Sequence, residues 1–236
     1  MSKLEGKVVV VTGAGRGIGL AIARACASHG AALALVGRHG AILRNAARQI
    51  SHGAVAIVAD VTRPGDVRRA FLRVKEKFGR VDVLVNNAGV FTYKPFVRTT
   101  IEDWRRNIET NLTSIFLTTQ AAIPLFRRSK MPHLVNILSV SSRDAFADCS
   151  AYTASKFGAL GLTRVLALEL RKRVIRVTAI LPGATNTRMM DEFGFPIHRD
   201  EIIQPEDVAQ AVVGALLTPR QATVEEIILT PSKGSL

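Results

Sequence analysis

The sequence predicts an α/β protein of the Rossmann type, a doubly wound single domain with about seven parallel strands and helices on both faces. Short runs of aliphatic and β-branched residues recur along the chain, and most are separated by stretches long enough for a crossover helix. Repeated strand, helix, strand units require a parallel sheet that is covered on both faces. The predicted strands are Lys7–Val11, Ala32–Val36, Val55–Ala59, Val81–Val85, Leu134–Leu138, Val174–Ile180 and Glu226–Leu229.

The segments between these strands carry helix signals. Apolar residues recur with a period near 3.6 after the first strand, at Ala21, Ile22, Ala25 and Cys26, and Gly30 is expected to end that helix. Further along, Pro64 is expected near the start of the third helix and Gly79 at its end. The run Gln-Pro-Glu-Asp at 204–207 predicts the start of the last helix.

The length and composition are those of one globular domain. A chain of 236 residues, 47% hydrophobic and 22% charged, buries a sizeable core on folding. No linker rich in Pro, Gly or Ser divides it, so residues 1–236 are expected to form a single domain.

Several classes of protein are excluded or disfavoured. The two cysteines, Cys26 and Cys149, are too few and too far apart for a zinc cluster or a disulfide framework, so we expect no metal site and a cytoplasmic protein. No apolar run approaches the 18 residues of a membrane span. The net charge of +13 makes an acidic partner worth considering, but no nucleic-acid-binding motif accompanies it, and polyanion binding rests on charge alone.

A glycine-rich turn follows the first predicted strand. It reads Thr-Gly-Ala-Gly-Arg-Gly-Ile-Gly over residues 12–19, and an apolar helix begins directly afterwards. Such a turn lets backbone approach a pyrophosphate, while the helix N-terminus offers free amide groups. The residues expected to contact a dinucleotide here are Gly13, Arg16, Gly17, Ile18 and Gly19.

The end of the second strand predicts which dinucleotide binds. An acidic side chain at this point would bind the ribose hydroxyls of NAD, whereas this chain has Gly37 followed by Arg38. Arg16 offers a second guanidinium for a 2′-phosphate. NADP(H) is therefore favoured, with NAD(H) as the alternative cofactor.

A tyrosine and a lysine lie four residues apart in the predicted helix after the fifth strand. Tyr152 and Lys156 would project from one helix face, a single turn apart. A cation about 5 Å from a phenol lowers its pKa by roughly two units at an effective dielectric near 20. A bound oxidised nicotinamide would act in the same direction. We therefore expect Lys156 and the nicotinamide together to bring Tyr152 toward a pKa at which it exchanges protons in neutral solution.

Together these motifs resemble the short-chain dehydrogenase/reductase family, including its 3-oxoacyl-carrier-protein reductases. The resemblance runs from Gly6 to Gly234. It rests on the order and spacing of TGAGRGIG, Asp60-Val61, Asn86-Asn87-Ala88-Gly89, Asn111, Ser139, YTASK and Pro182-Gly183.

The resemblance implies a catalytic set of Asn111, Ser139, Tyr152 and Lys156. Ser139 would bind the substrate carbonyl, with Ser141 and Ser142 as competing candidates, and Tyr152 would exchange the proton. Lys156 would bind the nicotinamide ribose and tune the phenol. Asn111 would hold a water that links Lys156 to solvent.

The resemblance also implies further cofactor contacts. Asp60 and Val61 would meet the adenine edge, and the segment Asn87, Ala88 and Gly89 would support the adenine ribose, whereas Asn86 is expected to be structural. At the nicotinamide end the implied contacts, besides Tyr152 and Lys156, are Pro182, Gly183, Thr185 and Thr187, with Thr187 the better match for the carboxamide.

The implied activity is hydride transfer between a nicotinamide and a carbonyl or secondary alcohol. We expect a small substrate lid at about 188–204, and a largely apolar pocket lined by Val140, Ser141, Phe146, Cys149, Ala184, Met189, Met190 and Phe193. Charged Arg143 and Asp144 would narrow or polarise its mouth and put a generic fatty acyl pocket in doubt.

The substrate is left open between a small ketone and a 3-oxoacyl thioester on an acidic carrier. Such a carrier would dock at basic clusters just beyond the helices that flank the site, Arg127, Arg128 and Lys130 and Arg171–Arg173. The alternatives are an NAD(H)-dependent dehydrogenase of a small hydroxy compound and a non-catalytic cofactor-sensing protein. The helices around Trp104–Phe116 and Ala151–Arg171 present more apolar residues than one sheet face needs. The resemblance implies that such helices pair across dimer axes, so we expect a homodimer or homotetramer.

Overall fold

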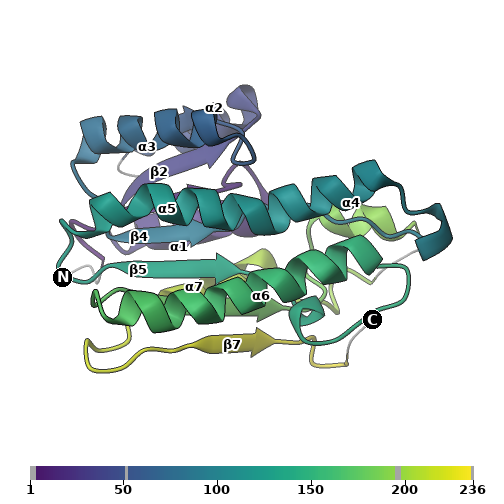
Figure 1. The fold of residues 1–236 in the computed structure, drawn as a ribbon. Helices are drawn as coiled ribbons and strands as arrows, with labels where there is room; N and C mark the ends of the chain where they lie inside the picture. The colour runs from purple at the N-terminus through teal and green to yellow at the C-terminus, as the bar shows by residue number, and fades with distance from the viewer. Residues whose placement is uncertain (1–3, 51–52, 195–197, 235–236) are drawn as a thin grey trace.

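The computed structural model describes residues 4–50, 53–194 and 198–234. Its centre is a seven-stranded parallel sheet with the strand order β3-β2-β1-β4-β5-β6-β7 (Figure 1). The predicted fold class is confirmed. The strands are β1 (Val8–Thr12), β2 (Ala32–Gly37), β3 (Val55–Val58), β4 (Val83–Asn86), β5 (His133–Ile137), β6 (Arg176–Pro182) and β7 (Glu226–Leu229).

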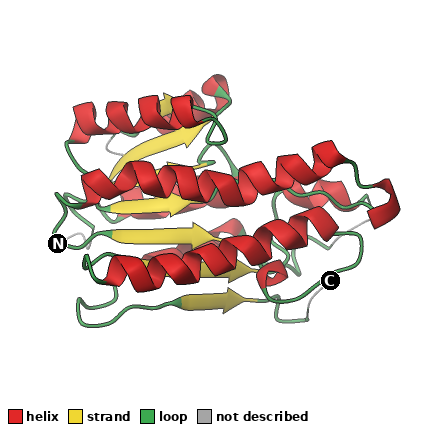
Figure 2. Ribbon diagram, in the orientation of Figure 1, coloured by secondary structure: helices red, strands yellow, loops and turns green. Residues whose placement is uncertain are grey.

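Helices cover both faces of the sheet (Figure 2). Helices α1 (Gly17–Ser28), α2 (Gly40–Arg48) and α7 (Pro205–Leu216) pack on one face. Helices α3 (Pro64–Phe78), α5 (Ser114–Phe126) and α6 (Ser150–Arg171) pack on the other. Helix α4 (Ile101–Ile108) runs through a π-helical turn (Glu109–Thr113) directly into α5.

Alternate residues of the central strands enter two separate cores. Val9 and Val11 of β1 face the α1 side, while Val10 between them faces the α3 side, and all three are fully buried. Successive side chains of a strand point to opposite faces, so a strand covered on both faces must be apolar throughout. This explains why the buried strands read as continuous apolar runs.

Some element boundaries differ from the predicted ones. The fourth strand begins at Val83 instead of Val81, and the sixth begins at Arg176 instead of Val174. Val174 has a φ of 59° in the turn that leaves α6, so it is not extended. The expected helix signals hold, because Pro64 is the first residue of α3 and Gly79 ends it with a left-handed φ of 72°.

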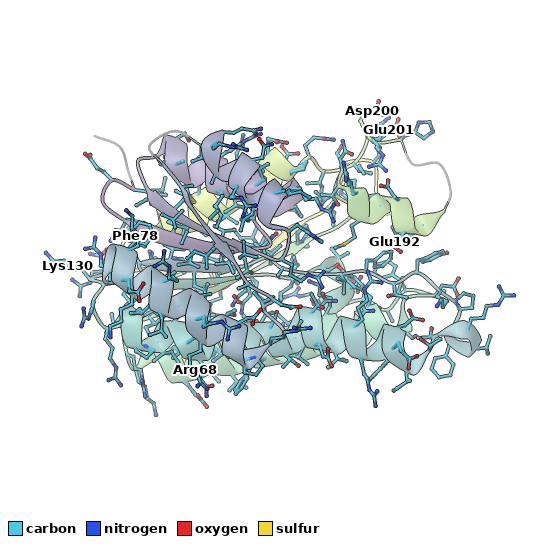
Figure 3. All side chains as sticks on the ribbon, turned by 90° about the horizontal axis from the view of Figure 1, so that it is seen from above. Arg68, Phe78, Lys130, Glu192, Asp200 and Glu201 are labelled. Carbon is cyan, nitrogen blue, oxygen red and sulfur yellow. The ribbon has the colours of Figure 1, made fainter. Side chains whose placement is uncertain are left out.

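The basic clusters do not lie beside the expected site within one chain. The crossover helices run antiparallel to the strands, so the C-terminal ends of α5 and α6 lie at the edge where strands begin. Arg128 donates to Gly79 O ahead of β4, and Arg171 pairs with Glu225 ahead of β7. Lys130 and Glu192 accordingly appear at opposite ends of the molecule in Figure 3. The predicted placement of the carrier-docking clusters is therefore wrong for a single subunit.

The described part of the chain also bears on the classes considered from composition. Cys26 and Cys149 are both free and buried. Within the described ranges, no helix is long and apolar enough to cross a bilayer, and no group of three or more His, Cys, Asp or Glu side chains is placed to hold a metal ion.

A buried carboxylate ties together the edge of the sheet where the strands begin. Asp82 accepts hydrogen bonds from Val8 N at 2.9 Å, from Arg80 Nε at 2.9 Å and from Ser129 Oγ at 2.5 Å. Burial alone would raise the pKa of the Asp82 carboxyl, but the hydrogen bonds from Ser129, Val8 and Arg80 outweigh it and lower the pKa. Asp82 thus joins β1, β4 and the segment after α5.

We expect Asp82→Asn to lower the free energy of unfolding by about 2–4 kcal/mol at pH 7, because an ionised acceptor for three donors is lost from a buried position. The folded pKa is depressed, so the carboxylate contributes its full stability above its unfolded pKa and loses it as pH falls through the folded value. The difference between wild type and variant should therefore shrink below about pH 4. Urea titrations between pH 3 and 7 measure it.

Glu76→Gln is the matched control. Glu76 pairs with Arg73 on the exposed face of α3, where such pairs contribute at most about 0.5 kcal/mol. Equal losses in the two variants would contradict the role given to Asp82.

Candidate active site

A cavity of about 1220 Å³ opens at the edge where the strands end. The strand order reverses between β1 and β4, and ligands of open α/β sheets bind at such a point. Most of the predicted site residues lie on its wall, from Gly13 in the glycine turn to Thr187 after β6. Gly19 and Asn111 do not line it, since both are buried behind the wall.

Hydrogen bonds from the end of β4 hold the glycine turn. Asn87 Nδ2 donates to Thr12 O at 2.9 Å and to Gly13 O at 3.3 Å, while the Thr12 hydroxyl accepts from Asn87 N and Ala88 N. A Cβ on Gly13 would lie 2.9 Å from Asn87 Nδ2, and one on Gly19 would lie 2.4 Å from it. Gly13 and Gly19 therefore permit the close contact of the two segments.

The turn suits an anionic ligand such as a pyrophosphate. Arg16 is the N-cap of α1, but its side chain makes no capping hydrogen bond. All residues of α1 are described, and none in its first turn is acidic. Free amide groups at a helix N-terminus and the positive end of its dipole attract anions. Gly17, with a φ of 54°, lies against Thr187, whose Cγ2 would be 3.2 Å from an added Cβ.

One end of the cavity has positive side chains. Arg16 and Arg38 line it close to Asp60 and Val61, which follow β3. Burial would raise the pKa of Asp60, but hydrogen bonds from Thr62 and the charges of Arg38 and Arg63 lower it. Gly37 and Arg38 bring no carboxylate to the end of β2, so this end fits a phosphate better than ribose hydroxyls alone.

Ser139, Tyr152 and Lys156 come together on the wall beyond the glycine turn. The Ser139 hydroxyl lies near enough to the Tyr152 phenol to lower its pKa. The ammonium of Lys156 lies 5.6 Å from the centre of the Tyr152 ring and donates to Ile137 O at 3.2 Å. The side chains thus meet as the spacing predicts, on one face of α6 and against the end of β5.

Burial dominates the protonation of this group. It raises the pKa of Tyr152 to about 12; the hydrogen bond with Ser139 lowers it and the nearby Cys149 raises it. Burial also lowers the pKa of Lys156 to about 8. In the ligand-free site desolvation disfavours the charged forms of both groups. The expected lowering of the Tyr152 pKa by Lys156 together with a bound oxidised nicotinamide stays a prediction.

Asn111 lies in the π-helical turn, and its side-chain amide is hydrogen-bonded to other residues of the protein. Its Oδ1 accepts from Val90 N at 2.9 Å, and its Nδ2 donates to Val90 O and Ser155 Oγ, each at 2.9 Å. This side chain joins the loop after β4 to α6. Its expected part in holding a water stays a prediction.

The competing candidates for the roles of Ser139 and Thr187 lie in different positions relative to the cavity. Ser141 lines the cavity, whereas Ser142 is buried away from it. Thr185 donates to Gly183 O at 2.9 Å and is buried, and Thr187 caps the short 3-10 helix Arg188–Phe193 by accepting from Met189 N. Pro182 and Gly183 end β6 on the cavity wall, as predicted.

The far end of the cavity is apolar and aromatic. All eight predicted pocket residues line it. Phe91 and Tyr93 line it as well, and the sequence reasoning missed them. Both residues follow the end of β4. Their position just after the carboxyl end of a strand is the sequence signal that could have identified them. Asp144 lies on the wall as expected, while Arg143 pairs with Glu226 and does not line the cavity.

Comparisons with known proteins agree with this geometry. The family described as short chain dehydrogenase matches residues 7–194. A sepiapterin reductase of Chlorobaculum tepidum is 38% identical over 239 residues, which cover 97% of this chain and 98% of that protein.

Two solved structures are similar over almost their whole length. A metagenomic short-chain oxidoreductase in complex with NADP has a TM-score of 0.85 and 34% identity, covering 98% of this chain and 99% of that one. A 3-ketoacyl-(acyl-carrier-protein) reductase from Brucella melitensis complexed with NADH has a TM-score of 0.90 and 30% identity, with the same coverage.

We expect Gly19→Ala to weaken NADPH binding at least tenfold, because the new methyl group would overlap Asn87 Nδ2 and lie 2.5 Å from Gly13 O. The turn must then move away from β4. Titration of NADPH fluorescence measures the dissociation constant. Gly214→Ala is the control: it lies in α7 with nothing within 4 Å of an added Cβ, so it should leave binding unchanged and stabilise the helix by about 0.5–1 kcal/mol. Unchanged NADPH binding in Gly19→Ala would contradict the role given to Gly19 in the close contact between the glycine turn and Asn87.

Proposed function

The chain belongs to the short-chain dehydrogenase family, and from that premise we propose that it is an NADP(H)-dependent oxidoreductase that interconverts a carbonyl compound and a secondary alcohol. The observation that carries the proposal is the buried group of Ser139, Tyr152 and Lys156 on the wall of a cavity whose other end has a glycine turn and two arginines. The group of Ser139, Tyr152 and Lys156 supports carbonyl chemistry, and the glycine turn with its two arginines supports binding of a dinucleotide.

Residues of the chain itself would transfer the proton to the substrate. The Ser139 hydroxyl donates a hydrogen bond to the substrate oxygen, and the Tyr152 hydroxyl gives that oxygen its proton during reduction. With a pKa near 12 in the ligand-free site, Tyr152 carries this proton throughout the neutral range. When bound, the nicotinamide supplies the hydride that the carbonyl carbon receives.

Lys156 would stabilise the phenolate that the transfer leaves behind. Its ammonium is held by Ile137 O close to the Tyr152 ring, where water is excluded and charges interact strongly. It would also bind the nicotinamide ribose. Asn111 would act as a positioning residue, because its hydrogen bonds join the loop after β4 to Ser155.

The positive end of the cavity favours NADP(H). Arg16 and Arg38 offer guanidinium groups for a 2′-phosphate, and Gly37 leaves room beside them. Both NADP and NADH occur in the similar structures. NAD(H) is thus the alternative cofactor, and with it a small hydroxy compound as substrate.

A 3-oxoacyl thioester is the second candidate substrate. It is supported by the similarity to a protein described as a 3-ketoacyl-(acyl-carrier-protein) reductase. The basic clusters of the same subunit lie at the opposite edge and do not add support. We also infer a homo-oligomer from the exposed apolar side chains on α5 and α6, Phe116, Phe157, Val165 and Leu168.

Replacing the proton donor tests the proposal. We expect Tyr152→Phe to lower kcat for NADPH-dependent ketone reduction by about 10²–10⁴, the usual contribution of a positioned acid. NADPH binding should stay within about twofold, because the ring remains and only the hydroxyl is lost. Reduction is followed by loss of NADPH absorbance over a panel of ketones. Full activity in Tyr152→Phe, or no NADPH binding by the wild type, would refute the proposal.

Replacing the end of β2 tests the choice of cofactor. In Gly37→Asp/Arg38→Ala a carboxylate takes the place of the guanidinium, so we expect the ratio of kcat/KM for NADPH to that for NADH to fall by at least 100-fold. Two charge-assisted contacts change, each contributing about 1.5–3 kcal/mol. Arg44→Ala on neighbouring α2 is the control and should keep the wild-type ratio. An unchanged ratio in the double variant would disprove the assignment to NADP(H).

A further inference from the structure

We propose that the natural substrate carries its carbonyl on or beside a flat aromatic or conjugated ring, and that Phe91, Tyr93 and Phe193 select this ring. The proposal rests on the oxidoreductase function above and specifies the substrate class of the same site. The reaction is the reduction already described: hydride adds to the carbonyl carbon, Tyr152 protonates the oxygen, and NADPH is oxidised.

Three rings make a continuous wall that starts at the proton donor. The Phe91 ring meets the Tyr152 ring edge to face, with 4.8 Å between centroids and 90° between planes. The Phe193 ring lies 5.0 Å from Phe91 and 5.0 Å from Tyr93, tilted by 45° and 47°. Phe91 and Tyr93 are nearly parallel at 6.4 Å. These are the offset and edge-on geometries that aromatic groups favour, and a substrate ring can join them.

The aromatic residues of the chain are concentrated here. The sequence contains ten Phe, two Tyr and one Trp, and at least five of these thirteen line the cavity. Both tyrosines are among them. The large cores on the two faces of the sheet consist mainly of aliphatic residues. The rings at the cavity form a separate small cluster with Cys149 and Met189, and this cluster presents aromatic surface to a bound molecule.

The outer ring is held in position. Phe193 ends the 3-10 helix Arg188–Phe193, and Gly194 follows in a left-handed conformation. Arg199 braces this helix by donating to Asn186 Oδ1 and Thr187 O and by pairing with Asp191. A positioned ring loses little conformational freedom when a ligand binds, which favours a selective contact.

Charged side chains at this end of the cavity are more exposed to solvent than the residues beside Tyr152. Arg106, Asp144 and Glu192 line the cavity but are exposed, whereas Phe91 and Cys149 beside Tyr152 are buried. A substrate would therefore place its apolar ring inward and its polar groups toward solvent. A flexible acyl chain would bury area against these walls, but it would not gain from the relative orientation of the rings.

A matched pair of ketones tests the proposal. Acetophenone and cyclohexyl methyl ketone carry six-membered rings of the same carbon number, one flat and aromatic and one puckered and saturated. Their different intrinsic reactivities cancel when the ratio of their kcat/KM values is compared between enzymes. With NADPH, we expect this ratio to fall about three- to tenfold in Phe193→Leu and in Tyr93→Leu, because leucine keeps an apolar side chain and removes the ring.

Two variants control for the change of side chain. Phe193→Tyr keeps the ring and should retain the wild-type ratio. Phe96→Leu removes a ring that is 78% exposed on the same loop as Phe91 and does not line the cavity, so it should leave the ratio unchanged. NADPH dissociation constants and melting temperatures show that each variant is folded and loaded.

The outcomes separate this proposal from the oxidoreductase function. If ketones are reduced but the ratio stays within twofold in both leucine variants, the ring selection is refuted and the oxidoreductase function stands. If acetoacetyl-CoA is reduced with a higher kcat/KM than both ketones and Phe193→Leu does not change it, an acyl thioester is the substrate class and the proposal is overturned. If the wild type binds no NADPH, the proposed function itself fails.

Discussion

The hydrogen-bonded junction between the ends of β1 and β4 is the constraint on which the site depends. Asn87 and Thr12 hold the glycine turn against the segment after β4, at the point where the strand order reverses. The same segment continues to Gly89 and Val90, which Asn111 ties to the helix carrying Tyr152 and Lys156. One set of polar contacts thus connects the glycine turn to the helix that carries Tyr152.

The packing of α6 at the end of β5 buries two ionisable groups together. Lys156 reaches Ile137 O because α6 packs against the end of β5, and the same packing removes Tyr152 from water. Desolvation then moves the two pKa values apart, up to about 12 for the phenol and down to about 8 for the ammonium. In the ligand-free protein the phenol is neutral over the physiological range, which is the form that a proton donor requires.

The fold and the meeting of Tyr152 with Lys156 could be predicted from the sequence because their signals are local. Buried parallel strands are apolar throughout, and Tyr152 and Lys156 are one helical turn apart, so period and spacing suffice. The contact of Phe91 with Phe193 joins two loops about one hundred residues apart, and no periodic pattern marks it. The pKa of Tyr152 depends on burial by several elements, which a spacing argument leaves out.

The misplacement of the basic clusters has a different cause. A right-handed crossover connects parallel strands, so each helix must run back and end at the edge where the next strand begins. Arg128 and Arg171 follow such helices and therefore lie away from the cavity. Among the positive side chains that line the cavity, Arg16 and Arg38 follow β1 and β2. In this fold side chains placed directly after strands reach the cavity, and the same rule puts Phe91 against the Tyr152 ring.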